Sequence, residues 1–337
     1  MNNPRVTVLM SVYNGECYLN EAIDSILTQT FTDFEFLIID DASTDNTPDI
    51  LSSYPDPRIK IITNEENLGL TRSLNKGLAV AQGDYIARMD ADDISLPERL
   101  EVQVNFMDSN SNVCVCGSWI QIIGENAGDI WRYPISHDEI VCRHLFECSI
   151  AHPSVILNKK YLSENQIHYN DTYKKSQDYE LWVRISGSYA LANIGRVLLK
   201  HRIHAGAIGQ MYSDNQKEWA DRVRYQQLSE FLSLQPTPEE RILHSLISIG
   251  ALNTRSNYLH DIDQWLQKIR NANMERKHYN DSILFRELSF RWLMACKNAT
   301  NRSNNTWKQF KNSPFFEGDA ITRRQKYSLF ITCFLKR

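Results

Sequence analysis

The sequence lacks both of the glycine-rich phosphate-binding motifs that α/β proteins commonly carry. No G-x-G-x-x-G follows the first strand-like run, and G-x-x-x-x-G-K-[ST] occurs nowhere in the 337 residues. These absences exclude the dinucleotide fingerprint and the P-loop. If this protein binds phosphates, a different device must neutralise their charge. A divalent cation held by carboxylates is the device for which the sequence has the residues.

The sequence also lacks an excess of positive charge, a cysteine pattern and a long apolar run. Its net charge of −4 gives no overall basic field, so no nucleic-acid partner is expected. The seven cysteines include no C-x-x-C pair, which argues against a disulfide framework and a zinc site. No uncharged apolar stretch is long enough to span a bilayer, and the N-terminus shows no signal-peptide pattern. We therefore expect an intracellular, cytoplasmic protein.

The first part of the chain alternates short β-branched runs with helical patterns. The strand-like runs cover residues 6–12, 34–39, 59–62 and 85–87, with helical segments near 16–30, 46–53 and 70–82. Mostly apolar runs separated by helices indicate parallel strands buried on both faces and joined by right-handed crossovers. With 42% hydrophobic residues, the chain can form the sizeable core that such a sheet needs. The sequence predicts an α/β fold with a Rossmann-like, mostly parallel central sheet flanked by helices.

Polar side chains follow each of these four runs, at the point where the strand should end. They lie in Tyr13-Asn14-Gly15, in Asp40-Asp41 with Ser43 and Asp45, in Asn64 with Asn67 and Gly69, and in Asp90-Ala91-Asp92-Asp93. Ligands of doubly wound sheets bind at the carboxyl ends of the strands. A single Asp-Asp pair would be weak evidence, because Asp and Asn are ordinary turn and cap residues. Four such ends in succession indicate a binding site along one edge of the sheet.

The fourth strand end places three carboxylates within four residues, Asp90, Asp92 and Asp93. Clustered carboxylates repel one another, and a divalent cation held by oxygen ligands is the usual compensation. Taken alone, the cluster is explained equally well as an acidic loop tip that caps the helix starting near Pro97. Its place after three other polar strand ends favours a metal site, and a metal carrying a diphosphate would fit there.

From about residue 215 onward the pattern turns helical and polar. Thr237-Pro238-Glu239-Glu240 forms a capping box with proline at the first helical position, and an apolar run follows from Ile242 to Ile249. Further helical stretches lie near 258–270 and 281–297. We therefore expect a site-bearing α/β domain over residues 1–210 and a helical C-terminal region over residues 211–337.

Residues 323–337 form an amphipathic segment with basic residues at both ends. A helix there would place five apolar residues on one face, namely Tyr327, Phe330, Ile331, Phe334 and Leu335. This arrangement suits a helix lying in an anionic membrane surface. A helix docked on the protein's own body explains it equally well, and both interpretations stay open.

Taken in order, the motifs resemble those of the family-2 glycosyltransferases, which have the GT-A fold. The resemblance is carried by Ser11-Val12-Tyr13-Asn14-Gly15, Asp40-Asp41-Ala42-Ser43-Thr44-Asp45, Asn67-Leu68-Gly69, Leu74-Asn75-Lys76-Gly77 and the run from Gly83 to Asp93. It continues with Pro97, Arg99, His152-Pro153-Ser154 and the run from Gln177 to Trp182. The resemblance covers residues 5–205 and implies that the first domain binds a nucleotide sugar and is catalytic. The C-terminal third inherits nothing from it.

The resemblance also implies roles for single residues. Asp90 and Asp92 match the two acids of the family's D-x-D motif, which bind the ribose and a Mg²⁺ or Mn²⁺ ion that bridges the diphosphate. His204 falls where relatives carry a histidine, and it would add a metal or diphosphate contact. Asp93 is expected to support the loop and the helix that follows. The residues expected to bind the donor are Tyr13, Asn14, Asp41, Asn67, Arg72 and Asp90.

Asp178 matches the acid that acts as general base in inverting members of the family. Taken alone it would be a helix N-cap, because Ser176-Gln177-Asp178 leads directly into an amphipathic run. Both interpretations can hold, since a cap position also fixes the carboxylate. The sequence departs from the family pattern at Gln177, where an acid often precedes the base. It departs again at His201, where an aromatic residue is common, and the role of His201 stays open.

The resemblance implies an inverting, metal-dependent enzyme of the hexosyltransferase kind. It would move a sugar from a nucleoside diphosphate sugar, most often a UDP-sugar, to a hydroxyl of a lipid-linked saccharide acceptor. Synthesis of O-antigen, capsule or exopolysaccharide at the inner face of the cell membrane is the expected setting. Two alternatives stand beside it, a non-catalytic nucleotide-sugar-binding or scaffold protein of the same fold and a nucleotidyltransferase. A binding protein does not require the general base at Asp178, which argues against the first alternative. A nucleotidyltransferase would require a glycine-rich, basic phosphate loop early in the chain, which this sequence lacks.

Overall fold

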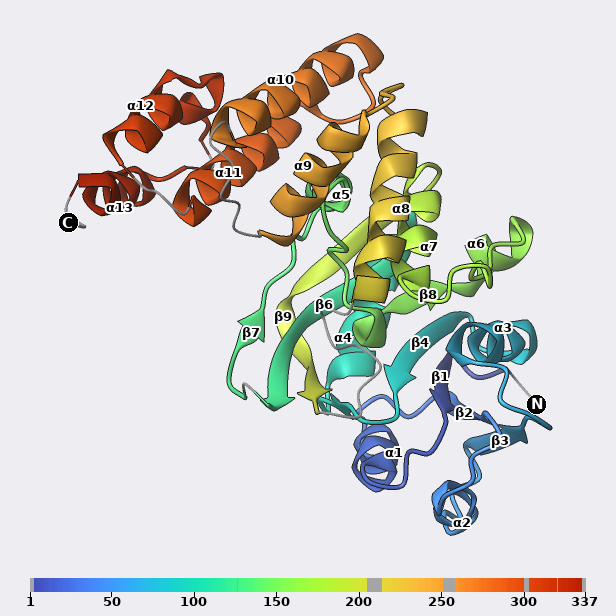
Figure 1. The fold of residues 1–337 in the computed structure, drawn as a ribbon. Helices are drawn as coiled ribbons and strands as arrows, with labels where there is room; N and C mark the ends of the chain where they lie inside the picture. Colours follow the sequence, from blue (N-terminus) through green and yellow to red (C-terminus); the bar gives the residue numbers. More distant parts are fainter. Residues whose placement is uncertain are drawn as a thin grey trace. The chain divides into compact units, whose positions relative to one another are not determined.

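The computed structural model describes residues 3–125, 127–204, 214–250, 258–299, 303–319 and 321–334. The chain forms two compact units, each with its own core (Figure 1). The first consists of Met1–Ile140 and Ser149–Trp219, and the second of Val141–Cys148 and Ala220–Arg337. The boundary predicted at residue 210 lies outside the described residues. The short segment Val141–Cys148 belongs to the helical unit, which no sequence pattern indicated.

Four parallel strands form one half of the sheet in the first unit. They are β1 (Val6–Val12), β2 (Phe34–Asp40), β3 (Ile59–Thr63) and β4 (Tyr85–Asp90), in the order β3-β2-β1-β4. The helices between them in the chain are α1 (Leu19–Leu27), α2 (Thr47–Ser52) and α3 (Leu70–Val80). Every residue of β2 is buried, as expected of a strand covered on both faces. The predicted parallel α/β arrangement is confirmed.

The other half of the sheet is mixed, and its order continues β4-β8-β6-β9-β5. Its strands are β5 (Ile94–Ser95), β6 (Val113–Gly124), β7 (Ile130–Trp131), β8 (Ile156–Asn158) and β9 (Ala190–Ile203). Strand β8 runs antiparallel to both β4 and β6, β9 runs parallel to β6, and β5 runs antiparallel to β9. The remaining elements of this half are α4 (Arg99–Ser109), α5 (His137–His144), η1 (His152–Ser154), α6 (Lys159–Glu164) and α7 (Gln177–Ser186).

The short strand β5 decides where the acidic loop lies. Ile94 pairs with Lys200, so the loop between β4 and β5 is held against the carboxyl end of β9. Asp90 is the last residue of β4, and Asp92 and Asp93 lie between it and the first residue of β5. Residues more than a hundred positions apart in the chain are thereby brought to one place.

An apolar core holds the parallel strands in register. Val8, Met10, Phe36 and Ile38 are wholly buried, and each such side chain contributes about 1.5–3 kcal/mol of hydrophobic stabilisation. Helix α3 approaches β1 so closely that a Cβ at Gly77 would lie 2.3 Å from a methyl carbon of Leu9. The rigid sheet therefore fixes the positions from which the site loops depart.

The second unit is helical. Its helices are α8 (Asp214–Glu230), which begins in the first unit, α9 (Pro238–Ile249), α10 (Tyr258–Arg276), α11 (Asp281–Asn298), α12 (Asn304–Asn312) and α13 (Arg323–Phe334), with a 3-10 turn η2 (Pro314–Glu317). Thr237 and Glu240 make both hydrogen bonds of the predicted capping box, which is confirmed. Within the ranges described above, no helix is both long and apolar enough to cross a membrane.

The segment Val141–Cys148 is part of the core of this helical unit. Leu145 and Phe146 are wholly buried in the same cluster as Trp292 and Phe310. The backbone of the segment is also tied down, because Nε of Arg224 donates to the carbonyl of Phe146 at 2.6 Å. The helical unit is thus completed by eight residues that the chain supplies from between β7 and η1.

Candidate functional site

The carboxyl ends of the four parallel strands lie at one edge of the sheet. Val12 on β1 pairs with Asp40 on β2, and Asp40 pairs with Thr63 on β3. On the other side of β1, Ser11 pairs with Asp90 on β4. The polar loops that follow these strands therefore start from neighbouring points, as the sequence pattern predicted.

Asp41, predicted to bind the donor, is buried and fastens the loop after β3. Its Oδ1 accepts the Asn64 amide at 2.7 Å and the Leu68 N–H at 2.9 Å, and its Oδ2 accepts the Gly69 N–H at 2.8 Å. Gly69 has a positive φ of 84°, which favours glycine. The same Gly69 N–H lies 3.1 Å from Oδ1 of Asn67. The structure therefore brings Asp41 and Asn67, two predicted site residues, into one turn.

The loop after β1 is bound to the loop after β2. The backbone N–H of Asn14 donates to Ser43 Oγ at 3.0 Å, and Oδ1 of Asn14 accepts the Thr44 N–H at 2.8 Å. Beside it, the side chain of Tyr13 is half-exposed, with 50% of its surface accessible. A ring presented in this way at the edge of the sheet can stack on a nucleotide base.

Arg72, the remaining predicted donor contact, lies in α3 and is exposed. Its Nε is 3.3 Å from Oδ2 of Asp171, which is also exposed. Such exposed pairs contribute about 0–1 kcal/mol, so Arg72 can exchange this partner for another anion. The structure places Arg72 with Asp171 and shows no contact between Arg72 and the acidic cluster after β4.

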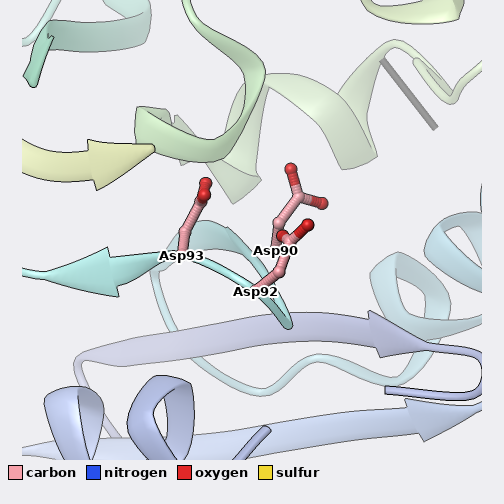
Figure 2. A group of neighbouring side chains, drawn as sticks. All are labelled: Asp90, Asp92 and Asp93. Atoms are coloured by element: carbon pink, nitrogen blue, oxygen red, sulfur yellow. The ribbon is translucent and has the colours of Figure 1, made fainter. Parts of the chain in front are cut away.

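The three aspartates of the acidic cluster lie together and are directed toward the same side of the loop that carries them (Figure 2). One oxygen from each lies within 4.8 Å of the others. Asp93 is wholly buried, whereas the side chains of Asp90 and Asp92 are 27% and 28% exposed. Only Asp90 and Asp92 therefore present carboxylate surface to solvent.

Asp93 is bound to strand β9. It accepts the backbone N–H of Arg202 at 2.9 Å and lies 3.0 Å from Nδ1 of His201. Burial raises the pKa of Asp93 to about 6. Burial lowers the pKa of His201, but its hydrogen bond with Asp93 and the nearby carboxylates outweigh that effect and raise the pKa to about 9. His201, whose role the sequence left open, is thus a cation that compensates part of the acidic cluster.

His204 lies beside Asp92, one of the two partly exposed aspartates of the cluster. Its Nε2 is 3.0 Å from Oδ2 of Asp92, and its ring lies 4.9 Å from that of Tyr18. Burial raises the pKa of Asp92, the charge of Asp90 adds to this effect, and the hydrogen bond with His204 opposes it. The structure therefore brings together Asp90, Asp92 and His204, the three predicted metal contacts. Carboxylate oxygens and an imidazole nitrogen form a donor set that fits Mn²⁺, while Mg²⁺ prefers the oxygens.

Arg88 is a charged group at the site that the sequence reasoning missed. It lies within β4, is buried, and holds both carboxylate oxygens of Asp90, with Nη1 at 2.6 Å from Oδ2. Residues two apart in a strand point to the same side, so a charge two positions before Asp90 was the available signal. Arg99 is also buried, and its Nη2 donates to the carbonyl of Arg88 at 2.6 Å.

Asp178 lies in the first turn of α7. The interpretation of Asp178 as an N-cap is wrong, because Ser176 is the N-cap and the helix begins at Gln177. Burial raises the pKa of Asp178, and the negative charge of Asp90 adds to this, while a backbone hydrogen bond from Tyr179 and the positive charge of Arg88 oppose it. The charges of Arg88 and Asp90 thus act on Asp178, so α7 holds the predicted base within electrostatic range of the end of β4.

A buried pair, His152 and Tyr169, lies within electrostatic range of Arg88 and Asp178. His152 Nε2 lies 2.7 Å from the hydroxyl of Tyr169, and the charges of Arg88 and Asp178 both act on Tyr169. The backbone of Tyr169 is held by Asn75, which donates to its carbonyl and accepts its N–H, each at 2.9 Å. Asn75 and His152 both belong to motifs noted in the sequence, and the structure gives them this supporting position.

Comparison with known sequences points to sugar transfer. The family described as Glycosyl transferase family 2 has a sequence model that matches residues 7–187. An uncharacterized glycosyltransferase of Haemophilus influenzae is 36% identical over 244 residues, which cover 69% of this chain and 76% of that protein. The UDP-Glc:alpha-D-GlcNAc-diphosphoundecaprenol beta-1,3-glucosyltransferase WfgD of Escherichia coli is 28% identical over 222 residues, covering 65% of this chain and 85% of that enzyme.

Comparison with solved structures gives the same fold at low sequence identity. S. aureus TarS 1-349 in complex with UDP-GlcNAc matches with a TM-score of 0.56 and 16% identity, covering 98% of this chain and 93% of that one. The mannosyltransferase PcManGT from Pyrobaculum calidifontis, in complex with GDP-Man and Mn²⁺, matches with a TM-score of 0.51 and 15% identity, covering 95% and 87%. At such identities the likeness shows the fold alone.

Proposed function

This chain belongs to glycosyl transferase family 2 and is a glycosyltransferase with the GT-A fold, and from that premise we propose that it transfers a hexose from a UDP-sugar to a saccharide hydroxyl with inversion. The observation that carries the proposal is the convergence of Asp90, Asp92 and His204 at the end of β4, with Asp178 close by. Family membership argues against the nucleotidyltransferase, and relatives named as glycosyltransferases favour an enzyme over the non-catalytic scaffold.

In this proposal Asp90, Asp92 and His204 hold Mn²⁺ or Mg²⁺. Their carboxylate and imidazole atoms suit such an ion, and the two carboxylates are the exposed ones of the cluster. When bound, a divalent cation supplies the positive charge that stabilises a leaving diphosphate. Asp93 stays bound to β9 and keeps the loop in place.

The donor is proposed to lie along the edge formed by the loops after β1, β2 and β3. Tyr13 would stack on the nucleotide base, and the turn that holds Asp41 and Asn67 would contact the base and ribose. Asn14 fixes the loop that carries Tyr13. Arg72, whose ion pair with Asp171 is exposed, would exchange that partner for the donor.

Asp178 is proposed as the general base. A sugar hydroxyl is a poor nucleophile at neutral pH, so a carboxylate must take its proton as the oxygen attacks the anomeric carbon. The raised pKa of Asp178 makes this carboxylate a better proton acceptor than an ordinary aspartate. Attack from the face opposite the diphosphate, in a single displacement, inverts the anomeric centre.

The name of one relative supports a finer assignment of the substrates. WfgD is named for UDP-Glc as donor and for a diphosphoundecaprenol-linked acceptor. We therefore propose a UDP-sugar donor and a lipid-linked saccharide acceptor. An enzyme with such an acceptor would act in the assembly of O-antigen, capsule or exopolysaccharide, at the inner face of the cell membrane.

The test is a panel of nucleotide sugars, with nucleoside diphosphate release measured in Mn²⁺, Mg²⁺ or EDTA. We expect one UDP-sugar to be turned over, only with a divalent cation, and to raise the melting temperature of the protein by mass action. Asp178→Asn should keep the fold and the donor-induced stabilisation while losing at least about a hundredfold in transfer. Full transfer by this variant would contradict the role of Asp178, and no response to any donor would contradict the whole proposal.

A further inference from the structure

Helix α13 carries an exposed aromatic face. Tyr327, Phe330 and Phe334 are 65%, 38% and 40% exposed, and their spacing of three and four residues places them on one side of the helix. Trp307 of α12 lies beside this face with its ring 5.2 Å from that of Phe330, but it is partly buried against the core of the helical unit. We call Tyr327, Phe330 and Phe334 the aromatic strip. Large exposed apolar groups gathered in this way mark a surface that binds something.

The opposite side of α13 is docked on the helical unit. Leu329 is wholly buried and Cys333 nearly so, and both belong to the core cluster that contains Trp292. The sequence left two interpretations of this segment open, a helix docked on the protein's own body and a helix lying in a membrane surface. One face of α13 packs on the body, and another face stays exposed. Leu335, predicted for the exposed face, lies outside the described residues, and Ile331 is partly buried.

The residues around the aromatic strip are basic. Residues 303–334 contain five basic and two acidic residues, although the whole chain has a net charge of −4. Four of the five, Lys308, Lys311, Arg323 and Arg324, are exposed. The sequence adds Lys336 and Arg337 just beyond. Basic residues thus outnumber acidic ones in the segment that carries the aromatic strip, against the sign of the whole chain, although Glu317 and Asp319 are exposed there too.

We propose that the aromatic strip and its basic neighbours bind the surface of an anionic lipid bilayer. Aromatic rings favour the boundary between headgroups and acyl chains, and basic residues favour anionic headgroups. A second copy of the chain fits less well, because a two-fold contact through this face would bring the same basic residues against one another. The inference draws on the proposed function only in the lipid-linked acceptor, which gives such an enzyme a reason to reach a membrane.

The experiment is flotation of the full-length protein with vesicles of phosphatidylethanolamine and phosphatidylglycerol, compared with vesicles of phosphatidylcholine alone. We expect flotation with the anionic vesicles, weakened by salt, and little with the neutral ones. Arg323→Gln/Arg324→Gln should weaken binding to anionic vesicles about 25-fold, at about fivefold for each basic residue. Tyr327→Ser/Phe330→Ser/Phe334→Ser should abolish flotation.

Matched controls lie at the end of α10, where Met274, Arg276 and Lys277 are all exposed. Arg276→Gln/Lys277→Gln and Met274→Ser change the same kinds of group elsewhere on the helical unit and should leave flotation unchanged. Melting temperatures of all variants near that of the parent protein would show that the fold is intact.

Three results would overturn the inference. They are no flotation of the parent protein with anionic vesicles, equal flotation of the aromatic triple variant, and a parent dimer that the triple variant converts to monomer without any vesicle binding. Donor turnover measured without vesicles reports the proposed function separately. If the protein turns over donor but does not float, only the membrane inference is contradicted. If it floats but does not turn over donor, only the proposed function is contradicted.

Discussion

The three aspartates at the end of β4 and in the loop that follows differ in the groups that contact them. Asp93 is held by His201 and a backbone N–H of β9, Asp92 by His204, and Asp90 by the buried Arg88. Each carboxylate thus has its own partner. Arg88 lies two residues before Asp90 in β4, whereas His201 and His204 lie at the end of β9 and just after it, distant in the sequence. At the scale of single residues, each of these pairs can therefore be removed separately by mutation.

Arg88→Met tests the buried partner of Asp90. Removing one member of a buried ion pair leaves the other charge without its partner. We therefore expect the free energy of unfolding in EDTA to fall by about 3 kcal/mol. Urea unfolding measures this change. Arg72→Met is the matched control, because its pair with Asp171 is exposed and should contribute about 0–1 kcal/mol. Equal losses in the two variants would show that Arg88 has no special importance.

Asp178 should also determine the acid side of the pH profile. A general base must be ionised, and burial raises the pKa of Asp178 above the ordinary aspartate value of 3.8. The rate of transfer should therefore be full at neutral pH and fall, as the pH decreases, at a higher pH than an ordinary aspartate would give. The pH dependence of kcat measures this pKa, and an acid limb at or below pH 3.8 would contradict the assignment.

At the scale of elements, helices α9 and α10 enclose a histidine that cannot easily take up a proton. His244 is wholly buried, its Nε2 donates to the carbonyl of Leu145 at 2.9 Å, and its Nδ1 accepts the indole N–H of Trp265 at 3.2 Å. Both nitrogens are therefore satisfied in the neutral ring. Burial lowers the pKa of His244 to about 3, and the charges of Arg224 and Arg291 add to the effect.

This depressed pKa makes the helical unit sensitive to acid. The unfolded chain takes up a proton below pH 6.5 while the folded unit does not, so stability is complete above pH 6.5 and decreases as the pH falls toward about 3. We expect a loss of up to about 1.4 kcal/mol per pH unit from this group. Thermal melts at several pH values should show a smaller slope for His244→Gln, and no change of slope for the exposed His168→Gln. An unchanged slope in His244→Gln would contradict the prediction.

Local sequence patterns were sufficient to predict some elements of the fold but not strand β5. Periodicity alone predicted the parallel strands and their helices, because buried strands and amphipathic helices leave strong local patterns. The capping box of α9 was equally local. Strand β5 has only two residues, and a run that short leaves no such pattern. Its pairing with β9, which positions the whole acidic loop, was therefore not predictable.

At the scale of the whole molecule, the helical unit depends on the segment Val141–Cys148. A chain ending at residue 219 would keep this segment but lose the helices that bury Leu145 and Phe146. Each of these side chains would forfeit about 1.5–3 kcal/mol of burial and would be exposed to solvent. We expect such a fragment to aggregate.

Expression of residues 1–219 with size-exclusion chromatography tests this expectation. A second fragment carrying Leu145→Ser/Phe146→Ser should be more soluble, because the two exposed apolar groups are gone. A soluble, monomeric fragment with the parent sequence would contradict it and would show that the first unit folds without the second.

The sequence by itself determined the fold class and the edge of the sheet where the site lies, since both follow from local periodicity and from polar residues at strand ends. Its ordered motifs also indicated the family, by resemblance. Only the tertiary structure decided how the site's charges are compensated. His201 and His204 reach the acidic loop through the pairing of β5 with β9, and a local pattern does not specify which strands pair. Arg88 lies only two residues before Asp90, but only the structure shows that it is buried and paired with that carboxylate. The same reason applies to Val141–Cys148, whose apolar residues pack in the core of the helical unit, with residues from much later in the chain.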